Sequence, residues 1–291
     1  MNKDSERAVP NSSGTNRPRT KAPANAADCH MHIYDPRAPQ LASRSPVANA
    51  GVPEYRLLQK RIGTTRVVVV QPRNHTTNNQ VTLGALAQLG PNARGIAVLH
   101  PTVTDAELRK LDAGGIRGIR FSLGDPATAV VTIDMVEPLA KRVAALGWHV
   151  QLHMPGDMIA QNAELLLRLP SPIVIDHMGR LPPAVGIAHP AYKIIHGLVE
   201  KGRTWVKLAG AYFNSQIGPP SYAGAATIAQ AFVKAAPERL VWGSDWPHPS
   251  EKEKPDDALL FDLLAEWAMD EKTRNRILVA NPEALYGFSA R

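Results

Sequence analysis

Short runs of β-branched residues recur along the chain, and segments with helical patterns separate them. Apolar runs such as VVVVQ, IVID and RLVWG are typical of strands buried on both faces of a parallel sheet. We predict eight strands: Asp28–Tyr34, Arg66–Gln71, Gly95–His100, Ile116–Phe121, Trp148–His153, Ile173–His177, Trp205–Ala209 and Leu240–Asp245. Repeated alternation of strands with helices favours a closed barrel, so we expect an α/β fold consisting of a single-domain (β/α)₈ TIM-type barrel.

The segments between these strands carry signals for helix ends. Asp105–Leu111 follows Thr104, which is a suitable N-cap, and a glycine pair comes shortly after it. We also predict helices over Val136–Leu146 and Met158–Leu169.

The start of the chain differs in composition from the rest. Residues 1–26 are rich in Ser, Asn, Pro and Arg, so we predict a disordered N-terminal tail there and assign residues 27–291 to the barrel. The alternative is a short arm folded over the barrel.

Composition narrows the possible partners. The formal net charge is +7, but several basic residues lie in the tail and the others are scattered, which argues against a nucleic-acid partner and favours a small anionic substrate. The single cysteine, Cys29, excludes a disulfide framework and indicates an intracellular, cytoplasmic protein. No apolar run approaches the roughly 20 residues of a membrane span. The oligomeric state is not indicated.

Polar side chains fall repeatedly at the ends of the predicted strands. In a (β/α)₈ barrel these carboxyl ends form the catalytic face, and a cluster of buried polar groups there is difficult to explain by core packing. The strand-end residues are His30, His32, Gln71, His100, Arg120, His153, His177 and Asp245.

The first strand offers a pair of imidazoles. Because side chains alternate along a strand, His30 and His32 point to the same face, as ligands of a divalent metal ion often do. The alternative is that both are structural. Asp245 can ligate a metal or act as general base, and its alternative role is to cap a loop.

Several motifs resemble one family over about residues 27–288. Asp28-x-His30-x-His32 and Gly243-Ser-Asp245-Trp-Pro-His-Pro resemble the two ends of an amidohydrolase-superfamily barrel. Ile175-Asp-His177-Met-Gly-Arg180, Gly115-Ile-Arg-Gly-Ile-Arg120-Phe, Arg94-Gly-Ile-Ala-Val and Leu278-Val-Ala-Asn281-Pro-Glu-Ala-Leu-Tyr286 resemble its branch of 2-pyrone-4,6-dicarboxylate lactonases and 4-sulfomuconolactone hydrolases.

The resemblance implies hydrolysis of a lactone in the breakdown of aromatic compounds. It assigns His30, His32 and His177 to polarising the lactone carbonyl, and Asp245 to deprotonating water. A related isomerase subgroup has Asn in place of this Asp, so Asp245 favours hydrolysis.

This chain departs from the pyrone lactonase pattern in its anion-binding residues. His153 stands where that enzyme has Tyr, and Gly124-Asp125-Pro126 and Ala211-Tyr212-Phe213 stand where it has arginines. Arg73 stands in place of a small polar residue. We therefore predict an anion-binding frame of Arg73, Arg120 and Arg180 with His153, although each arginine has a surface ion pair as its alternative role. The specific hypothesis is a muconolactone-type substrate with a second anionic group, such as 4-sulfomuconolactone.

The resemblance does not decide whether the site binds a metal ion. Pyrone lactonases work without one, but His153 restores an imidazole where metal-dependent relatives have a ligand. We predict one divalent ion, with zinc as first choice, held by His30, His32, His153 and Asp245; a metal-free mechanism is the alternative.

Other functions are compatible with the same set of strand-end residues. The alternative functions are a metal-dependent decarboxylase or amidohydrolase of the same superfamily, an aldarolactone hydrolase or isomerase, and a non-catalytic barrel that binds a small anion. Among the remaining histidines only His248 is a functional candidate, as a residue that orients Asp245. The others are predicted to be structural or on the surface: His75, His100, His149, His189 and His196.

Overall fold

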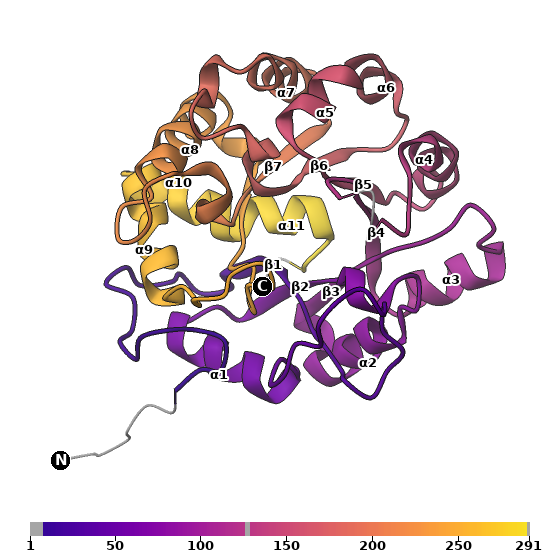
Figure 1. Ribbon diagram of the computed structural model, residues 1–291, viewed down its shortest axis with the longest axis horizontal. Coiled ribbons are helices and arrows are strands. Elements are labelled where there is room, and N and C mark those ends of the chain that lie inside the picture. The colour runs from indigo at the N-terminus through magenta and orange to yellow at the C-terminus, as the bar shows by residue number, and fades with distance from the viewer. Residues whose placement is uncertain (1–7, 126–128, 290–291) are drawn as a thin grey trace.

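The computed structural model describes residues 8–125 and 129–289 and shows a single sheet of eight parallel strands (Figure 1). The strands follow one another around the sheet in chain order, which confirms the predicted (β/α)₈ barrel. They are β1 (Ala27–Met31), β2 (Arg66–Val70), β3 (Ala93–Ala97), β4 (Ile116–Ser122), β5 (His149–His153), β6 (Ile173–Ile175), β7 (Thr204–Leu208) and β8 (Leu240–Trp242).

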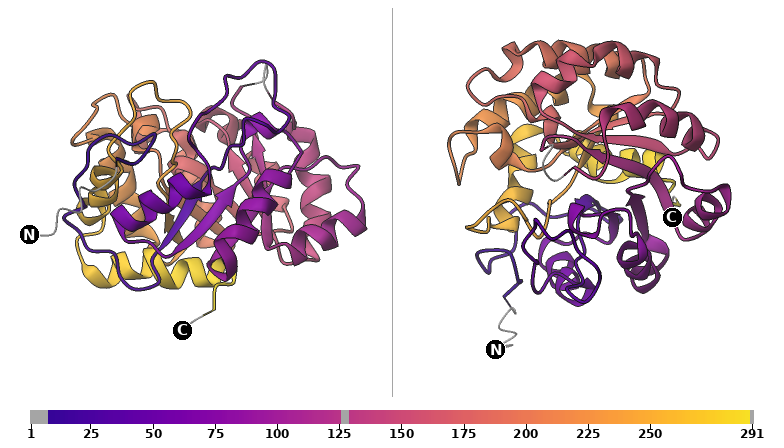
Figure 2. Two further views of the ribbon diagram at one scale, coloured as in Figure 1. Left: turned by 90° about the horizontal axis from the view of Figure 1, so that it is seen from below. Right: turned by 45° about the vertical axis from the view of Figure 1, so that its right-hand side comes forward.

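Helices surround the sheet on its outer side (Figures 1 and 2). They are α1 (Val52–Ile62), α2 (Gln80–Leu89), α3 (Asp105–Ala113), α4 (Val136–Ala144), α5 (Gly156–Gln161), α6 (Ala163–Arg168), α7 (Pro190–Glu200), α8 (Ala223–Ala235), α9 (Asp257–Trp267), α10 (Glu271–Asn275) and α11 (Asn281–Tyr286). In the described part of the chain, none of these helices has the length and apolar character needed to cross a membrane.

The structure confirms one predicted helix start and contradicts one predicted helix. Thr104 caps α3 as predicted, because its side chain accepts a hydrogen bond from the backbone N–H of Glu107. The single helix predicted over Met158–Leu169 is wrong: α5 and α6 are separate helices that meet at Asn162. The backbone of Asn162 leaves the helical region (φ −111°, ψ 21°), and both its N–H and its side-chain amide donate to the carbonyl of Met158.

The barrel closes between β1 and the segment that follows β8. The backbone N–H of Asp245 donates to the carbonyl of His30 (2.7 Å), and the N–H of His32 donates to the carbonyl of Trp246 (2.8 Å). Asp28 strengthens this seam by accepting hydrogen bonds from the backbone N–H (2.9 Å) and the hydroxyl (2.6 Å) of Ser244. The seam therefore brings the two ends of the barrel sequence into direct contact.

The amino-terminal end of the barrel is closed by the C-terminal segment, which runs along one end of the molecule (Figure 2, left). The Tyr286 ring of α11 packs against His149 at the start of β5, with ring centroids 5.4 Å apart. Beyond it, the guanidinium groups of Arg66 and Arg94 lie over the Phe288 ring. Access to the barrel interior is consequently left at the opposite, carboxyl end of the strands.

The N-terminal residues that the structure describes lie against the barrel. Val9 is buried, and the indole N–H of Trp246 donates to the carbonyl of Pro10 (2.8 Å). The guanidinium of Arg61 donates to the carbonyl of Asn16 (2.8 Å). Residues 8–26 thus form an arm folded over the barrel, the alternative to a disordered tail. Residues 1–7 of the predicted tail lie outside the described residues.

Candidate active site

The closing seam places three of the predicted site residues together at the carboxyl end of the barrel. Oδ1 of Asp245 lies 3.4 Å from Nε2 of His30 and 3.3 Å from Nε2 of His32. All three side chains are almost fully buried. The approach is this close because residue 243 is glycine: a Cβ atom there would lie 2.5 Å from Cβ of His30.

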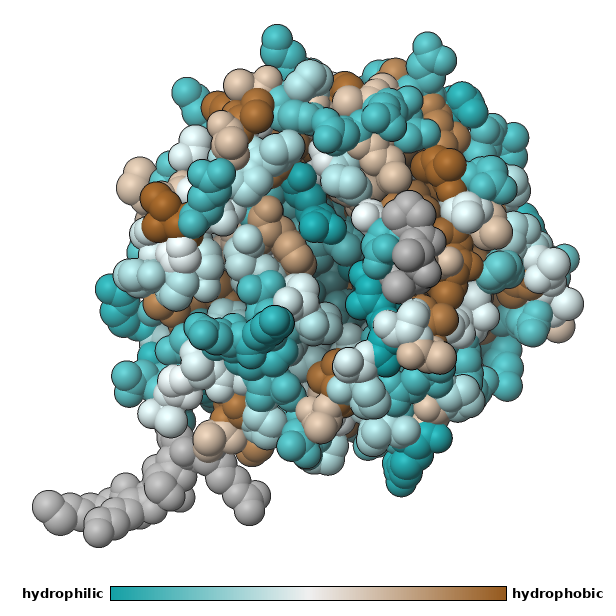
Figure 3. Space-filling view, viewed as in Figure 1, coloured by the Kyte–Doolittle hydropathy of each residue, from teal (hydrophilic) through white to brown (hydrophobic). Residues whose placement is uncertain are grey.

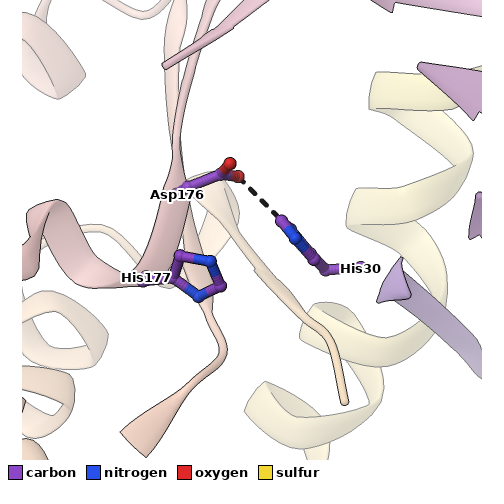
Figure 4. Close-up of side chains that lie close together, drawn as sticks. All are labelled: His30, Asp176 and His177. Carbon is purple, nitrogen blue, oxygen red and sulfur yellow. Dashed lines mark ion pairs between the residues drawn. The ribbon is translucent and has the colours of Figure 1, made fainter. Parts of the chain in front are cut away.

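His177 completes the group from the other side. It lies in the short 3₁₀ segment η5 (Asp176–Arg180) that follows β6, with a backbone φ of 50°. Its Nε2 is 4.0 Å from Oδ1 of Asp245, and its ring centroid is 4.7 Å from that of His30. Figure 4 shows Asp176 and His177 on this segment, with the Asp176 carboxylate directed at His30 and the His177 ring beside it.

The hydrogen bonds of the imidazoles determine which nitrogens face the carboxylate. Nδ1 of His32 lies 2.8 Å from the carbonyl of Val70, and Nδ1 of His177 lies 3.3 Å from the carbonyl of Ala209. A carbonyl only accepts, so both Nδ1 atoms carry the proton and both Nε2 atoms present lone pairs. Nε2 of His30 is buried and has no hydrogen-bond partner among the described residues. This arrangement of lone pairs around a carboxylate calls for a cation, either a metal ion or an additional proton.

Burial and nearby charge act in opposite directions on the pKa values of His30, His177 and Asp245. Burial lowers the pKa of His30 well below its usual range, and it also lowers the pKa of His177. Burial alone would raise the pKa of Asp245, but the neighbouring histidines hold it well below its usual range. Asp245 is therefore available as a proton acceptor at neutral pH.

A fully buried cluster of charges lies beneath His30. Asp176 accepts hydrogen bonds from Nε of Arg120 (3.0 Å) and from the amide of Gln151 (3.0 Å). Lys207 donates to Gln151 (2.7 Å), and its Nζ is 3.3 Å from Nδ1 of His30. Burial lowers the pKa of Lys207 to about 8, whereas nearby positive charge outweighs burial and holds the pKa of Asp176 well below its usual range. Asp176 is thus the counter-charge of two buried cations.

Four arginines line the cavity above this group. The cavity measures about 270 Å³, and the space-filling view shows a hollow bordered by hydrophilic residues near the centre of this end (Figure 3). Arg73, Arg120 and Arg180 of the predicted anion-binding frame line it, and so does Arg44. Burial lowers the pKa of Arg73 to about 10, so at neutral pH the guanidinium is still charged. Such a lining is suited to a small anion.

The arginines of the cavity lining have different neighbours. Arg44 and Arg73 both approach Oδ2 of Asp125, at 3.6 and 3.8 Å. Arg180 lies over the Phe213 ring, with its guanidinium carbon 4.8 Å from the ring centroid. Positive charge is therefore available at more than one point around a bound molecule.

His153 lines the cavity, but the structure gives its ring nitrogens other partners. Nδ1 is 2.8 Å from the hydroxyl of Ser122, and Nε2 is 3.3 Å from a guanidinium nitrogen of Arg180. Within the described residues, two groups have the spacing for a metal ion: His30 with His32 and Asp245, and His30 with Asp176 and His177. Neither includes His153.

The remaining histidines are away from the cavity lining. His248 is fully buried behind Asp245 and contacts Tyr212 and Asp257. His100, exposed, approaches the carbonyl of Val130. The others have partners outside the cavity: His75 with Pro39, His149 with Tyr286, His189 with Asp157 and His196 with Glu200.

Sequence reasoning missed four residues of the site region: Asp176, Lys207, Tyr212 and Arg44. Lys207 carried a usable signal, since it is the one charge in the apolar run WVKLA. Asp176 stands directly before His177 in a motif that had been noted. Arg44 lies in a polar segment without periodicity, so the sequence offered no signal for it.

Comparisons with known proteins agree on one family. A model of the amidohydrolase family matches residues 27–288. The chain is 34% identical over 272 residues to a 4-sulfomuconolactone hydrolase of Rhizobium radiobacter, covering 91% of each chain. It is 34% identical over 278 residues to a D-galactarolactone isomerase of Agrobacterium fabrum, covering 94% of each. A solved structure of a probable 2-pyrone-4,6-dicarboxylic acid hydrolase from Acinetobacter baumannii, with citric acid bound, matches at 31% identity and a TM-score of 0.80, covering 91% of this chain and 100% of that one.

Replacing Asp176 by Asn tests the buried charge cluster. Removal of the counter-charge leaves Arg120 and Lys207 buried without compensation, so we expect Asp176→Asn to lower the free energy of unfolding by about 3–5 kcal/mol. Urea unfolding measures this change. Asp157→Asn, which breaks an exposed pair with His189, is the control and should cost about 0–1 kcal/mol. Equal losses in the two variants would contradict the assigned role.

Proposed function

The chain belongs to the amidohydrolase family, and from this premise we propose that it is a carboxylic-ester hydrolase that opens a small anionic lactone. One observation carries the proposal: an ionised, buried Asp245 faces three imidazoles at the bottom of a cavity lined by arginines. The relatives support it, because two of them are named for hydrolysis of a lactone or pyrone and the third for isomerisation of a lactone.

Asp245 is the proposed general base. Its Oδ1 takes one proton from water while the water oxygen bonds to the lactone carbonyl carbon. When the ring C–O bond breaks, Asp245 returns this proton to the ring oxygen, and the products are a carboxylic acid and a hydroxyl or enol group. Since the pKa of Asp245 is held low, it is a weak base, and the reaction depends on an electrophilically activated carbonyl.

The same residues are suited to holding one divalent ion. Three imidazole Nε2 atoms and a carboxylate oxygen converge, the Nδ1 atoms of His32 and His177 are oriented by carbonyls, and Nε2 of His30 has no partner in the described chain. We propose His30, His32 and Asp245 as ligands, with His177 beside them. His153 is left out because both of its ring nitrogens have other partners. A bound ion would polarise the lactone carbonyl.

The arginine frame carries the proposal about substrate class. Arg44 and Arg73, beside Asp125, and Arg180, over the Phe213 ring, all line the cavity and offer planar donors to anionic groups. The bound citric acid in a relative is itself a small polyanion. We propose a muconolactone-type substrate with a carboxylate and a second anionic group, with 4-sulfomuconolactone as the specific candidate.

Isomerisation is the second candidate, because one relative is named for it. Asp245 favours hydrolysis, since a carboxylate can remove a proton from water whereas a neutral side chain cannot. A panel of 4-sulfomuconolactone, 2-pyrone-4,6-dicarboxylate and galactarolactone, with aromatic acids and amides added to detect decarboxylase or amidase activity, separates these functions.

In this panel we expect the protein to open the ring of butenolide lactones. The change in ultraviolet absorbance on ring opening measures this activity. Loss of the base should lower kcat by about 10²–10⁴-fold in Asp245→Asn. Asp134→Asn, at an exposed position, should leave kcat unchanged. Full turnover of the pyrone with none of the butenolides would refute the proposed substrate, and an active Asp245→Asn variant would refute the base.

Substitution of the frame arginines should affect binding more than turnover. A lost charge-assisted hydrogen bond contributes about 1.5–3 kcal/mol, so we expect Arg73→Met and Arg44→Met each to raise KM for the anionic lactone by about 10-fold or more. The exposed Arg56→Met on α1 is the control. A neutral lactone should show no such increase; the same rise in KM with both lactones would contradict anion binding.

Metal analysis of the purified protein tests directly whether a divalent ion is bound. Protein purified without added metal should contain about one equivalent of a divalent ion, and His32→Ala should lose it. Chelation should remove activity, and zinc should restore it. A fully active, metal-free preparation would remove the ion from the mechanism and support the metal-free alternative.

A further inference from the structure

A chain of buried polar groups runs behind Asp245, away from the cavity. The hydroxyl of Tyr212 donates to Oδ2 of Asp245 at 2.5 Å and lies 3.2 Å from Nδ1 of His248. Nε2 of His248 lies 3.2 Å from each carboxylate oxygen of Asp257. The three residues come from separate segments: the 3₁₀ turn η7 (Ala211–Asn214), the loop after β8, and the first turn of α9. None of the three is among the described residues that line the cavity.

The direction of these hydrogen bonds follows from the donors present. Tyr212 has a single hydroxyl hydrogen, and the carboxylate of Asp245 only accepts, so this hydrogen belongs to the contact with Oδ2. Nδ1 of His248 must then donate to the phenol oxygen. The other ring nitrogen faces Asp257, which accepts from it, so this pattern requires the doubly protonated, cationic form of His248 with Asp257 as its counter-charge. His248 and Asp257 are both fully buried, so water does not replace these contacts.

We propose that Tyr212 and His248 are positioning residues that hold Oδ2 of Asp245, so that Oδ1 alone is presented to the histidines and to the attacking water. This inference rests on the proposed role of Asp245 as general base. In this arrangement Oδ2 is held by Tyr212, whereas Oδ1 faces the histidines and is the oxygen that reacts.

The backbone of the loop after β8 is itself held in place, so the carboxylate of Asp245 can be positioned from behind. Asp245 and His248 both have positive φ angles (64° and 53°), and the N–H of His248 donates to the carbonyl of Asp245 (2.8 Å). The ammonium of Lys254 donates to the carbonyls of His248 and Glu251. These contacts place the Asp245 backbone, whereas the rotation of its carboxylate is set by Tyr212 on one side and the imidazoles on the other.

A purely structural role for Tyr212 makes a different prediction. Its ring packs against Phe213 and His248, with centroids 4.7 and 5.9 Å apart. If packing were its whole contribution, Tyr212→Phe would keep the ring and leave turnover unchanged. The positioning role instead depends on the single oxygen that this substitution removes.

The first experiment is the kinetics of Tyr212→Phe with the anionic lactone. We expect kcat to fall by about 10–100-fold, the range typical of lost outer-shell hydrogen bonds, with KM changed by less than about twofold because substrate contacts are intact. The matched control is Tyr222→Phe, another buried tyrosine, with unchanged kcat. Tyr212→Phe with wild-type kcat would overturn the proposal.

The second experiment asks whether His248 acts through Tyr212. His248→Asn keeps an N–H donor near the position of Nδ1, whereas His248→Gln keeps one near Nε2, so the Asn variant should retain the larger kcat. In the Tyr212→Phe background, neither substitution should lower kcat further. Independent, multiplicative losses would show that His248 does not act through the tyrosine.

A crystal structure of Tyr212→Phe separates this inference from the proposed function. If the wild-type protein opens none of the lactones, the proposed function fails, yet the structure still tests the positioning. We expect the Asp245 carboxylate to rotate away from its wild-type orientation while the backbone of the loop stays in place. A carboxylate that keeps its orientation without the tyrosine hydroxyl would overturn the inference.

Discussion

The seam between β1 and the segment after β8 is the interaction on which both fold and site depend. The hydrogen bonds that close the barrel are made by the backbone of His30, His32 and Asp245, whose side chains form the centre of the site. Gly243 permits this approach, because no Cβ fits against His30. Completion of the sheet and assembly of the site are therefore one event, and the site residues lie on the rigid part of the scaffold.

The electrostatic arrangement gives the site its chemical character. Asp176, below His30, compensates Arg120 and Lys207, while Asp245 lies among imidazoles that lower its pKa. Under the proposed function, a carboxylate in this position would need an activated carbonyl and an accurately held oxygen. Among the described residues, Nε2 of His30, which has no hydrogen-bond partner there, and Tyr212 behind Asp245 are the groups that would meet these two needs.

The arginines of the proposed anion-binding frame come from segments outside the seam. Arg44 comes from the long segment after β1, Arg73 follows β2, and Arg180 ends η5. Loops of a barrel can change without disturbing the strands, so the anionic groups that a substrate carries can be matched here while the centre of the site is kept. Relatives of similar identity that are named for different lactones are consistent with this division.

Sequence patterns were sufficient to predict the barrel and to select the residues at the centre of the candidate site. Buried parallel strands need apolar runs, and their carboxyl ends form one face, so His30, His32, His177 and Asp245 were identifiable from local pattern and position. Tertiary structure decided the rest: the arm of residues 8–26, the break at Asn162, the partners of His153, and the placement of Arg44 and Tyr212. A local pattern records which residues are buried, whereas hydrogen-bond partners depend on which distant loops converge. That convergence is set by closure of the barrel, which no short segment encodes.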